Sequence, residues 1–547
     1  MLNEININRL QKIVHYSKMG GKNNLYHEMR GNSIAKRFIH YDVKNGIEYA
    51  SVYTPRKVNG KKINDPEYLG RVIDKVQGVY RNRERGLFTY SIENGYGDIK
   101  ADAYYVDVLS IMSKEEKLIL DFGDAYCLYT TLKICGLYDI IYRLMPDQED
   151  TLMSLLGYKL LADSSNRYAE DWWEGSYTRV LFPNAKLRSQ RISEFYSYLG
   201  DEVVHRGFFN SYLSLFCRNK RVGVLIDSTG MPNNIHFPLT AINTHNGVTK
   251  SETRLVLVVD RKSGMPLFFR YNAGNIVDVT TLRSTIMELE AFGVDIGYAI
   301  VDAGYYSESN IKSLYGNDDD DNDESKAIPF LTRLGSNLKL YKQLVSEHAE
   351  DLSKSKYMLM QRDRLLSVKR VEVDLFGHSG YAYVAIDHMR REDEIYKYAK
   401  STLDIKDVSH EEMDATIKTK GLFILISSEK IETKDVMPLY YTRQIVEQIF
   451  DVSKNYADLL PLRVHNEETF RGHLMLSFIA TIVFLSINQL LKGTAFNTEG
   501  AFLVLRNQKC KVFDDRILPK EANKKMNDIF KKLKITPPIC IPIGGKN

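Results

Sequence analysis

The fold of this chain is decided at RVGVLIDST, residues 221–229, and DIGYAIVDAG, residues 295–304, two apolar runs that each lead into an aspartate. Runs rich in valine and isoleucine predict buried strands. Asp227 and Asp302 then stand where their strands end. In open α/β sheets, ligands and catalytic groups collect at that edge. The two aspartates are therefore the first candidates for a functional site.

Further strands and helices are expected around these two runs. They are a strand at 251–260, a strand at 265–274, a helix at 279–292, a helix at 307–316 and a strand at 327–334. The resulting order of three strands, helix, strand, helix, strand is the arrangement of a ribonuclease H-like α/β core. We therefore predict such a core from residue 221 onward.

Outside this core the hydrophobic periodicity changes several times. Residues 33–92 alternate like strands around an Asn59-Gly60 turn, whereas residues 122–221 repeat at the spacings of three and four that are typical of helices. After Leu334, alternating segments predict a β-rich insertion before the core resumes. The expected domains are a basic β-rich module (1–120), a helical DNA-binding region (121–220), the first part of the core (221–334), the β-rich insertion (335–430), the second part of the core (431–495) and a basic carboxyl-terminal tail (496–547).

The charge of the chain lies in patches. A net charge of +4 over 547 residues is too small to argue nucleic-acid binding from the total. Residues 31–90 have an excess of about six basic residues, and residues 506–534 have ten basic against four acidic ones. Such patches can neutralise phosphates, and an ordinary solvated face is the alternative.

The sequence also bears on the cellular compartment. The five cysteines are scattered, without the spacing of a disulfide framework or a zinc site. The start MLNEININRLQK lacks the apolar run of a signal peptide. Residues 474–491 are nearly all apolar, but the polar residues among them favour a buried core helix over a membrane span. We expect a cytoplasmic protein without a membrane partner.

Carboxylates from neighbouring strands need a cation between them. Asp227 and Asp302 repel one another without one, so the pair is typical of a magnesium or manganese site. Either aspartate alone is more often a turn residue at the end of a strand. The metal interpretation therefore needs a third partner.

That partner is expected from MPLYYTRQIVEQIFDVSKNYADLL, residues 437–460, interpreted as one helix. The spacing places four side chains on one face of that helix: Tyr440, Arg443, Glu447 and Lys454. Glu447 can complete a metal site, while Arg443 and Lys454 can hold phosphates. The alternatives are an ordinary salt-bridged surface helix and Asp451, on the same face, as the third acid.

The pattern Tyr440-x2-Arg443-x3-Glu447-x6-Lys454 resembles the tyrosine, arginine, glutamate, lysine signature of the family-four DDE transposases of bacterial insertion sequences. The contexts DSTG and DAGYYSESNI resemble the first and second aspartate motifs of that family. PFLTRLGSN and RVHNEETFRGHLMLSFIA are similar to its flanking segments. The resemblance covers about residues 223–491.

The resemblance implies a catalytic triad of Asp227, Asp302 and Glu447 that holds two Mg²⁺ ions, with Mn²⁺ as the other candidate since oxygen ligands suit both. It also implies that the other three signature residues hold phosphates of the transposon end. Arg471 follows the signature and is a further candidate for contact with DNA, or a residue that caps the apolar helix.

Some members of that family stack a flipped base on a tryptophan of the insertion, and this insertion contains none. The two tryptophans of the chain, Trp172 and Trp173, fall in the helical region, where a core position is favoured over a DNA-facing one. Any aromatic face can stack a base. The candidates in the insertion are Tyr341, Tyr357, Phe376, Tyr381 and Tyr383.

The implied function is that of a DNA transposase. Such a protein binds the terminal inverted repeats of its insertion sequence and catalyses metal-dependent cleavage and strand transfer. Two ends must be joined, so we expect a homodimer on double-stranded DNA. The alternatives are a nuclease with the same three acids and a catalytically inactive, transposase-derived DNA-binding regulator. Loss of any acid would favour the regulator, and all three are present.

Overall fold

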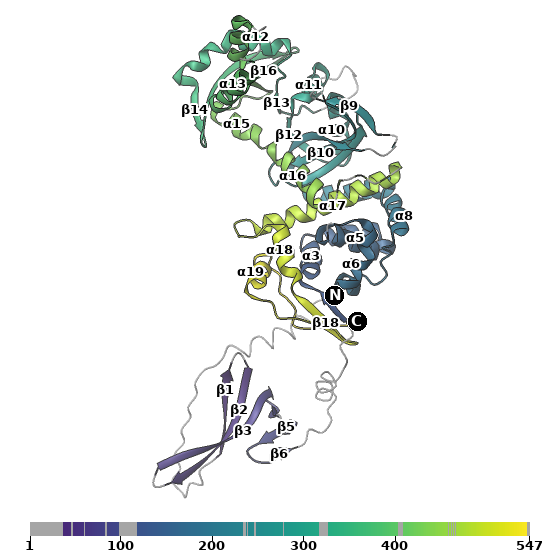
Figure 1. Cartoon of the computed structure of the whole chain (residues 1–547), viewed down its shortest axis with the longest axis vertical. Helices are drawn as coiled ribbons and strands as arrows, with labels where there is room; N and C mark the ends of the chain where they lie inside the picture. Colours follow the sequence, from purple (N-terminus) through teal and green to yellow (C-terminus); the bar gives the residue numbers. More distant parts are fainter. Residues whose placement is uncertain are drawn as a thin grey trace. The chain divides into compact units, whose positions relative to one another are not determined.

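The computed structural model describes residues 37–44, 47–58, 61–82, 85–97, 118–162, 164–233, 237, 239–245, 248–276, 278–316, 326–402, 409–457, 459–460, 462, 464 and 466–543. The chain divides into two compact units, residues 1–115 and residues 116–547 (Figure 1). Each unit is described by itself.

The first unit contains a six-stranded antiparallel sheet whose strand order follows the chain. Its strands are β1 (Phe38–Lys44), β2 (Ile47–Val58), β3 (Lys61–Asp74), β4 (Val79–Asn82), β5 (Gly86–Ser91) and β6 (Gly95–Gly97). A small apolar core that includes Val52, Leu69 and Tyr80 holds the sheet together. The strands expected from the alternation are therefore present. The Asn59-Gly60 turn lies outside the described residues, but Val58 and Lys61 pair on either side of it.

After the short strand β7 (Leu118–Asp121), the second unit continues with helices, as the three- and four-residue periodicity predicts. They are α3 (Gly123–Ile134), α4 (Leu137–Leu144), α5 (Glu149–Leu161), α6 (Ala169–Gly175), α7 (Thr178–Leu181), α8 (Ser189–Leu199) and α9 (Glu202–Cys217). Their apolar faces join the core that the rest of the unit uses, and Trp172 and Trp173 pack partly buried against it. The helical region is thus one side of a larger core rather than a separate domain.

Helix α17 (Glu467–Leu491) connects the helical region to the central sheet (Figure 1). By length and composition it is the one described helix that could cross a membrane. However, 72% of its 18-residue apolar stretch is buried inside the protein. Its backbone lies against α8, where a Cβ on Gly200 or on Gly472 would overlap a carbonyl of the opposite segment. The prediction of a buried core helix for residues 474–491 agrees with this position.

A large mixed sheet forms the centre of the second unit. Its order is β11-β10-β8-β12-β13-β17-β16-β15-β14, with β9 paired to β10. The strands of its first half are β8 (Arg221–Pro232), β9 (Ala241–His245), β10 (Val248–Asp260), β11 (Pro266–Ala273), β12 (Asp295–Val301) and β13 (Phe330–Arg333). β8, β10 and β11 are antiparallel neighbours, whereas β12 and β13 run parallel to β8. Helices α10 (Leu282–Ala291) and α11 (Glu308–Leu314) link these strands. The strands and helices predicted for residues 221–334 are therefore present.

The insertion continues the same sheet instead of forming a module of its own. Its elements are α12 (Lys339–His348), β14 (Met358–Gln361), β15 (Arg364–Leu375), β16 (His378–Asp387), α13 (His388–Thr402), α14 (His410–Thr419) and β17 (Leu422–Ser427). All six residues of β17 are buried, and the strand pairs with β13 on one edge and β16 on the other. A strand buried on both faces needs neighbours on both edges to satisfy its backbone. This is why the sheet is continuous, a feature that alternation alone did not predict.

The carboxyl-terminal segment differs from the expected basic tail. It folds into α18 (Thr498–Arg506), β18 (Lys509–Val512), β19 (Arg516–Pro519), α19 (Lys524–Lys532) and β20 (Ile541–Pro542). β18 pairs with β7 (Leu118–Asp121), so the two ends of this unit share a four-stranded sheet. Met526, Ile529 and Phe530 are buried at helical spacing beneath the lysines of α19. The segment is therefore amphipathic, with buried apolar residues at helical spacing among its basic ones, and counting its charges alone did not predict that it folds.

The signature segment is also divided. α15 (Thr433–Tyr441) ends one turn before α16 (Gln444–Tyr456) begins, so Tyr440 and Glu447 lie on different helices. Between the helices the amides of Thr442 and Arg443 bond to carbonyls three residues back, and the Thr442 hydroxyl donates to Leu439 O at 2.6 Å. A threonine that bonds a nearby carbonyl competes with the regular helical pattern. The expectation of one continuous helix is corrected accordingly.

Candidate active site

Two parallel strands bring the aspartates together. β8 and β12 pair with Ile226 opposite Val301, and the residue after each of these is Asp227 and Asp302. Both carboxylates therefore lie where the pairing of β8 with β12 ends. β12 ends there, whereas β8 continues past Asp227 to Pro232 beside its antiparallel neighbour β10, so the expectation that Asp227 ends its strand is corrected. Asp227 is nearly buried, with 8% of the residue exposed, while the side chain of Asp302 is 39% exposed.

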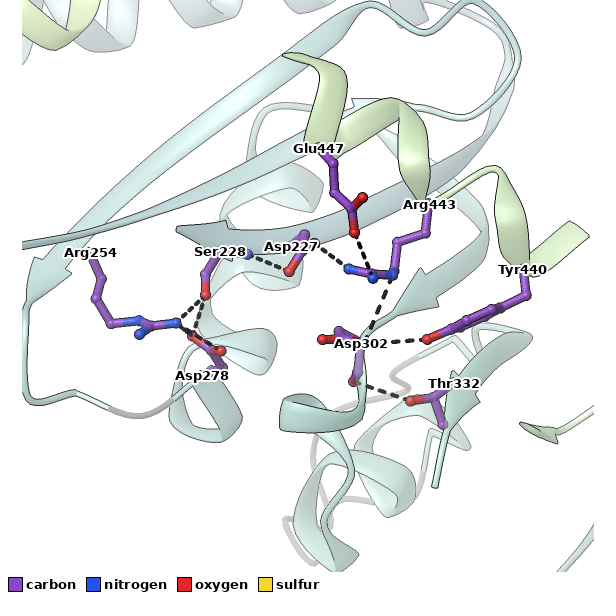
Figure 2. A network of polar contacts seen from close by, with 9 residues as sticks. All are labelled: Asp227, Ser228, Arg254, Asp278, Asp302, Thr332, Tyr440, Arg443 and Glu447. Atoms are coloured by element: carbon purple, nitrogen blue, oxygen red, sulfur yellow. Dashed lines mark hydrogen bonds and ion pairs between the residues drawn. The ribbon is translucent and has the colours of Figure 1, made fainter. Parts of the chain in front are cut away.

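The guanidinium of Arg443 lies among three carboxylates (Figure 2). Its Nη1 donates to Asp227 Oδ2 at 2.6 Å and its Nη2 donates to Glu447 Oε1 at 2.8 Å. Its Nε lies 3.9 Å from Asp302 Oδ1. One cation thus joins the three acids that were predicted from the sequence. We call Arg443 and these three acids the open cluster.

The electrostatics of Asp227 reflect its burial. Loss of solvent raises the pKa of this carboxyl to about 6, the cation of Arg443 lowers it, and the charge of Asp302 raises it. The Ser228 amide, which donates to Asp227 Oδ1 at 2.8 Å, lowers it further. A buried carboxylate beside a second one is stabilised by any cation that enters the site.

The donor set suits a hard divalent cation. Three carboxylates supply the oxygen ligands that Mg²⁺ and Mn²⁺ prefer, and the 53% exposed side chain of Glu447 leaves the site reachable from solvent. Within the described part of the chain, no group of three acidic, histidine or cysteine side chains converges closely enough to hold a metal. In this structure the three carboxylates contact Arg443 instead. Their chemistry suits divalent cations, but a metal ion could bind all three only if the guanidinium released them.

The other two signature residues contact the same part of the sheet. The Tyr440 hydroxyl donates to Asp302 Oδ1 at 3.3 Å, and burial raises the pKa of this phenol. Lys454 Nζ donates to Thr229 Oγ1 at 2.7 Å, and burial lowers the pKa of this ammonium. Asp227 and Thr229 are two positions apart on β8 and therefore share a face of the strand. Three signature side chains thus bond directly to this face or to Asp302, and Glu447 is joined to them through Arg443.

Asp451, the rival third acid, lies on the exposed surface of α16. It acts on Lys454 electrostatically, whereas the ion pairs of Arg443 are to Glu447, Asp227 and Asp302. The geometry therefore favours Glu447 over Asp451 as the acid that accompanies the two aspartates.

A second charged network lies on the other face of β8, and the sequence analysis missed it. Arg254 Nη2 donates to Asp278 Oδ1 at 3.0 Å and to Ser228 Oγ at 2.5 Å. Ser228 Oγ in turn donates to Asp278 Oδ1 at 2.6 Å (Figure 2). Arg254 Nη1 also lies 3.7 Å from Glu252 Oε1. We call Arg254, Asp278, Ser228 and Glu252 the closed cluster. The arginine inside the apolar strand SETRLVLVVD was the available signal.

Arg471 lies on α17 and is engaged within the protein. Its Nε donates to the Gly200 carbonyl and its Nη1 donates to Glu202 Oε2 at 2.8 Å. These bonds tie α17 to the junction of α8 and α9. Contact between Arg471 and DNA would have to compete with them. Arg471 does not cap α17 either, because the cap is Asn466, whose side chain accepts from the Thr469 amide at 2.8 Å.

The aromatic candidates of the insertion differ in availability. Tyr341 and Tyr383 are buried, and their hydroxyls donate to Leu422 O at 3.2 Å and Ile431 O at 2.8 Å. Their rings are therefore committed to the core. Tyr357 and Tyr381 are partly buried, and Phe376 is 38% exposed.

Comparison with known proteins relates one segment of this chain to a known family. Residues 218–483, which contain all three acids of the open cluster, match the family model described as "Transposase DDE domain". The match supports a DDE-type transposase. A search of the curated proteins found no match. Among solved structures, the chain is similar to one described as "Cryo-EM structure of piggyBac transposase synaptic complex with hairpin DNA (SNHP)", with 11% identity, a TM-score of 0.36, and coverage of 66% of this chain and 70% of that chain.

Proposed function

We propose that this protein is a DNA transposase that binds the terminal inverted repeats of an insertion sequence and catalyses metal-dependent cleavage and strand transfer. One observation carries the proposal. Asp227, Asp302 and Glu447 come from three separate elements of the segment that matches the DDE domain, and they meet around a single cation. DNA is the substrate, and a homodimer on double-stranded DNA follows from the need to process two ends.

The sheet supports a ribonuclease H-like core within this proposal. Three antiparallel neighbours, β11, β10 and β8, are followed by β12 and β13 in parallel to β8. This arrangement puts Asp227 and Asp302 side by side where the parallel pairing of β8 and β12 ends, the side of an α/β sheet at which ligands bind. α16 then supplies the third acid on that side.

In the proposed mechanism Asp227, Asp302 and Glu447 hold two Mg²⁺ ions, with Mn²⁺ as the alternative. When bound, such ions activate water and the freed 3′-OH and stabilise charge on the phosphorus. Tyr440 keeps Asp302 oriented through its hydroxyl. Arg443 holds the acids together in the protein alone. Its fork would suit a phosphate of the DNA equally well if a metal took its place among the acids.

The remaining assignments are part of the same proposal. The signature residues Tyr440, Arg443, Glu447 and Lys454 are those of the family-four group of insertion-sequence transposases. Lys454 lies beside Thr229, one pleat beyond Asp227, where an ammonium can hold the phosphate next to the cleaved one. The protein acts in the bacterial cytoplasm, on the DNA of the nucleoid.

The test is cleavage of a labelled duplex that carries the element's own terminal repeat, with Mg²⁺ and with EDTA. The wild type is expected to release a 3′-OH end only with the metal, and Asp227→Asn is expected to release none. Tight binding of the repeat without any cleavage by the wild type would instead support a catalytically inactive regulator derived from a transposase. Cleavage without strand transfer to a target duplex would support the nuclease.

A further inference from the structure

A cavity lies beside the open cluster, on the side of the insertion, and neither Asp227 nor Asp302 lines it. It lies between α15, α16 and the insertion strands and has a volume of about 190 Å³. This is far more than the roughly 10–15 Å³ that one water needs. Tyr440, Arg443 and Glu447 line it together with residues of β13, β15 and α13. The cavity therefore shares a wall with the open cluster.

The lining is rich in arginine. Four guanidinium groups face the cavity, against two carboxylates, those of Asp387 and Glu447. The four belong to Arg333 on β13, Arg364 on β15, Arg390 on α13 and Arg443. Both carboxylates are paired already, Glu447 with Arg443 at 2.8 Å and Asp387 with Arg364 at 3.2 Å. The cavity thus carries an excess of positive charge.

Arg333 is the informative member of this set. It is half-buried, and its guanidinium makes no ion pair or hydrogen bond to any described residue. Burial raises the pKa of the neighbouring Tyr440 and Tyr341, and the charge of Arg333 opposes this rise. Arg390 is paired at its Nε with Glu394 at 2.6 Å, and its side chain is 40% exposed. A half-buried arginine without an anion is costly to keep unless an anion binds it.

We propose that this cavity binds a phosphodiester of the substrate DNA strand through Arg333, Arg364 and Arg390, beside the cleavage site. The fork of arginine matches two phosphate oxygens. Phe423 and Tyr441 in the same lining provide an apolar wall for the attached sugar. The shared wall with Glu447 and Arg443 keeps such a strand within reach of the triad. The inference rests on the proposed function and gives the insertion, which supplies Arg364 and Arg390, a direct part in holding the substrate.

The experiment uses the full chain in EDTA, so that binding is measured without cleavage. A set of fluorescent terminal-repeat duplexes is prepared, each with a single uncharged methylphosphonate near the cleaved end. Wild type is expected to bind roughly tenfold more weakly to the duplex in which the methylphosphonate replaces the phosphate that occupies the cavity. Arg333→Met is expected to bind the unmodified duplex roughly tenfold more weakly and to be insensitive to that one substitution, while it keeps its sensitivity elsewhere.

The matched control is Lys397→Met. Lys397 lies on α13 like Arg390, but it is 74% exposed and outside the cavity. This variant is expected to keep the wild-type profile over all positions. Arg364→Gln repeats the test with a residue of β15. Because this variant leaves the buried Asp387 without its ion-pair partner, thermal unfolding is measured to detect any loss of stability. If Arg364→Gln does not fold, Arg333→Met still tests the inference, because Arg333 has no ion pair to lose.

Two outcomes would overturn the inference. If Arg333→Met keeps the full wild-type profile, the cavity holds no phosphate. If Lys397→Met changes the profile as Arg333→Met does, the effect is one of overall charge and not of the cavity. In both cases the proposed function stands as long as the wild type cleaves with Mg²⁺. A wild type that does not bind the repeat overturns the proposed function, and this inference with it.

Discussion

The two faces of β8 carry two arginine-centred clusters that differ in access. In the open cluster, Arg443 joins three acids from different elements, and the side chains of Asp302 and Glu447 are 39% and 53% exposed. In the closed cluster, Arg254 joins Asp278 and Glu252, whose side chains are only 22% and 10% exposed. Asp227 and Ser228 are consecutive residues of the strand and therefore point to opposite faces.

The difference indicates how one strand can support both structure and chemistry. A buried ion pair with every partner inside the protein is costly to break and fixes the positions of its members. An arginine among partly exposed acids can exchange its partners for a ligand. We infer that the closed cluster holds β8 in place and that the open cluster is the part that changes when metal and DNA bind.

The largest expected effect concerns the open cluster. Glu447→Gln is expected to reduce cleavage of the terminal-repeat duplex by about 1,000-fold or more, because the proposed metal site would lose one of its three ligands. Binding of the same duplex in EDTA is expected to stay nearly unchanged. Asp451→Asn, one turn further along α16, serves as the matched control and should cleave normally. Normal cleavage by Glu447→Gln, with loss in Asp451→Asn, would show that Asp451 is the third acid.

The comparison also predicts that replacing the two arginines affects stability and cleavage to different degrees. Arg254→Met leaves buried acids without their cation and is expected to lower the free energy of unfolding by about 3–5 kcal/mol. Arg443→Met leaves one buried acid, Asp227, and two acids that solvent can reach, Asp302 and Glu447, so we expect a smaller loss of stability than for Arg254→Met together with a large loss of cleavage. Urea unfolding of both variants in EDTA measures this. Equal losses of stability would remove the distinction between the clusters.

Asp227 makes stability depend on pH. Its pKa in the folded protein is about 6, above the ordinary 3.8, so the folded state holds this proton more tightly than the unfolded state. The resulting stabilisation is fully present below about pH 4 and is lost as pH rises through 6, and its size is on the order of 3 kcal/mol. Urea unfolding of wild type minus Asp227→Asn between pH 4 and pH 7 in EDTA should show this fall. A difference that rises with pH would contradict the assigned shift.

The smallest expected effect belongs to Lys454. Lys454→Met is expected to weaken binding of the terminal-repeat duplex a few-fold and to reduce the salt dependence of binding by about one phosphate contact. Lys434→Met, an exposed lysine of α15 that lies outside this network, is the control. If the two variants have the same salt dependence as wild type, Lys454 serves only to anchor α16 to Thr229.

The sequence alone determined much of the local structure in the segment that matches the DDE domain. Apolar runs before Asp227 and Asp302 predicted two strands, and both are present as β8 and β12, although β8 continues past Asp227. Helical spacing predicted that Glu447 and Lys454 share a helix, as they do in α16. These predictions of local structure succeeded because strand alternation and helical spacing are properties of neighbouring residues, whereas the catalytic role of the three acids stays a prediction. The buried position of α17 was likewise predictable from its polar interruptions.

Only the tertiary structure decided which partners these residues have. Neither the place of Arg443 among the acids nor the closed cluster of Arg254 follows from any local pattern, because ion pairing depends on distances between segments far apart in the chain. The same reason explains the pairing of β18 with β7 and the continuous sheet through β17. Local periodicity specifies the face that a segment buries, whereas the segment that covers this face is selected by packing and backbone pairing over the whole fold.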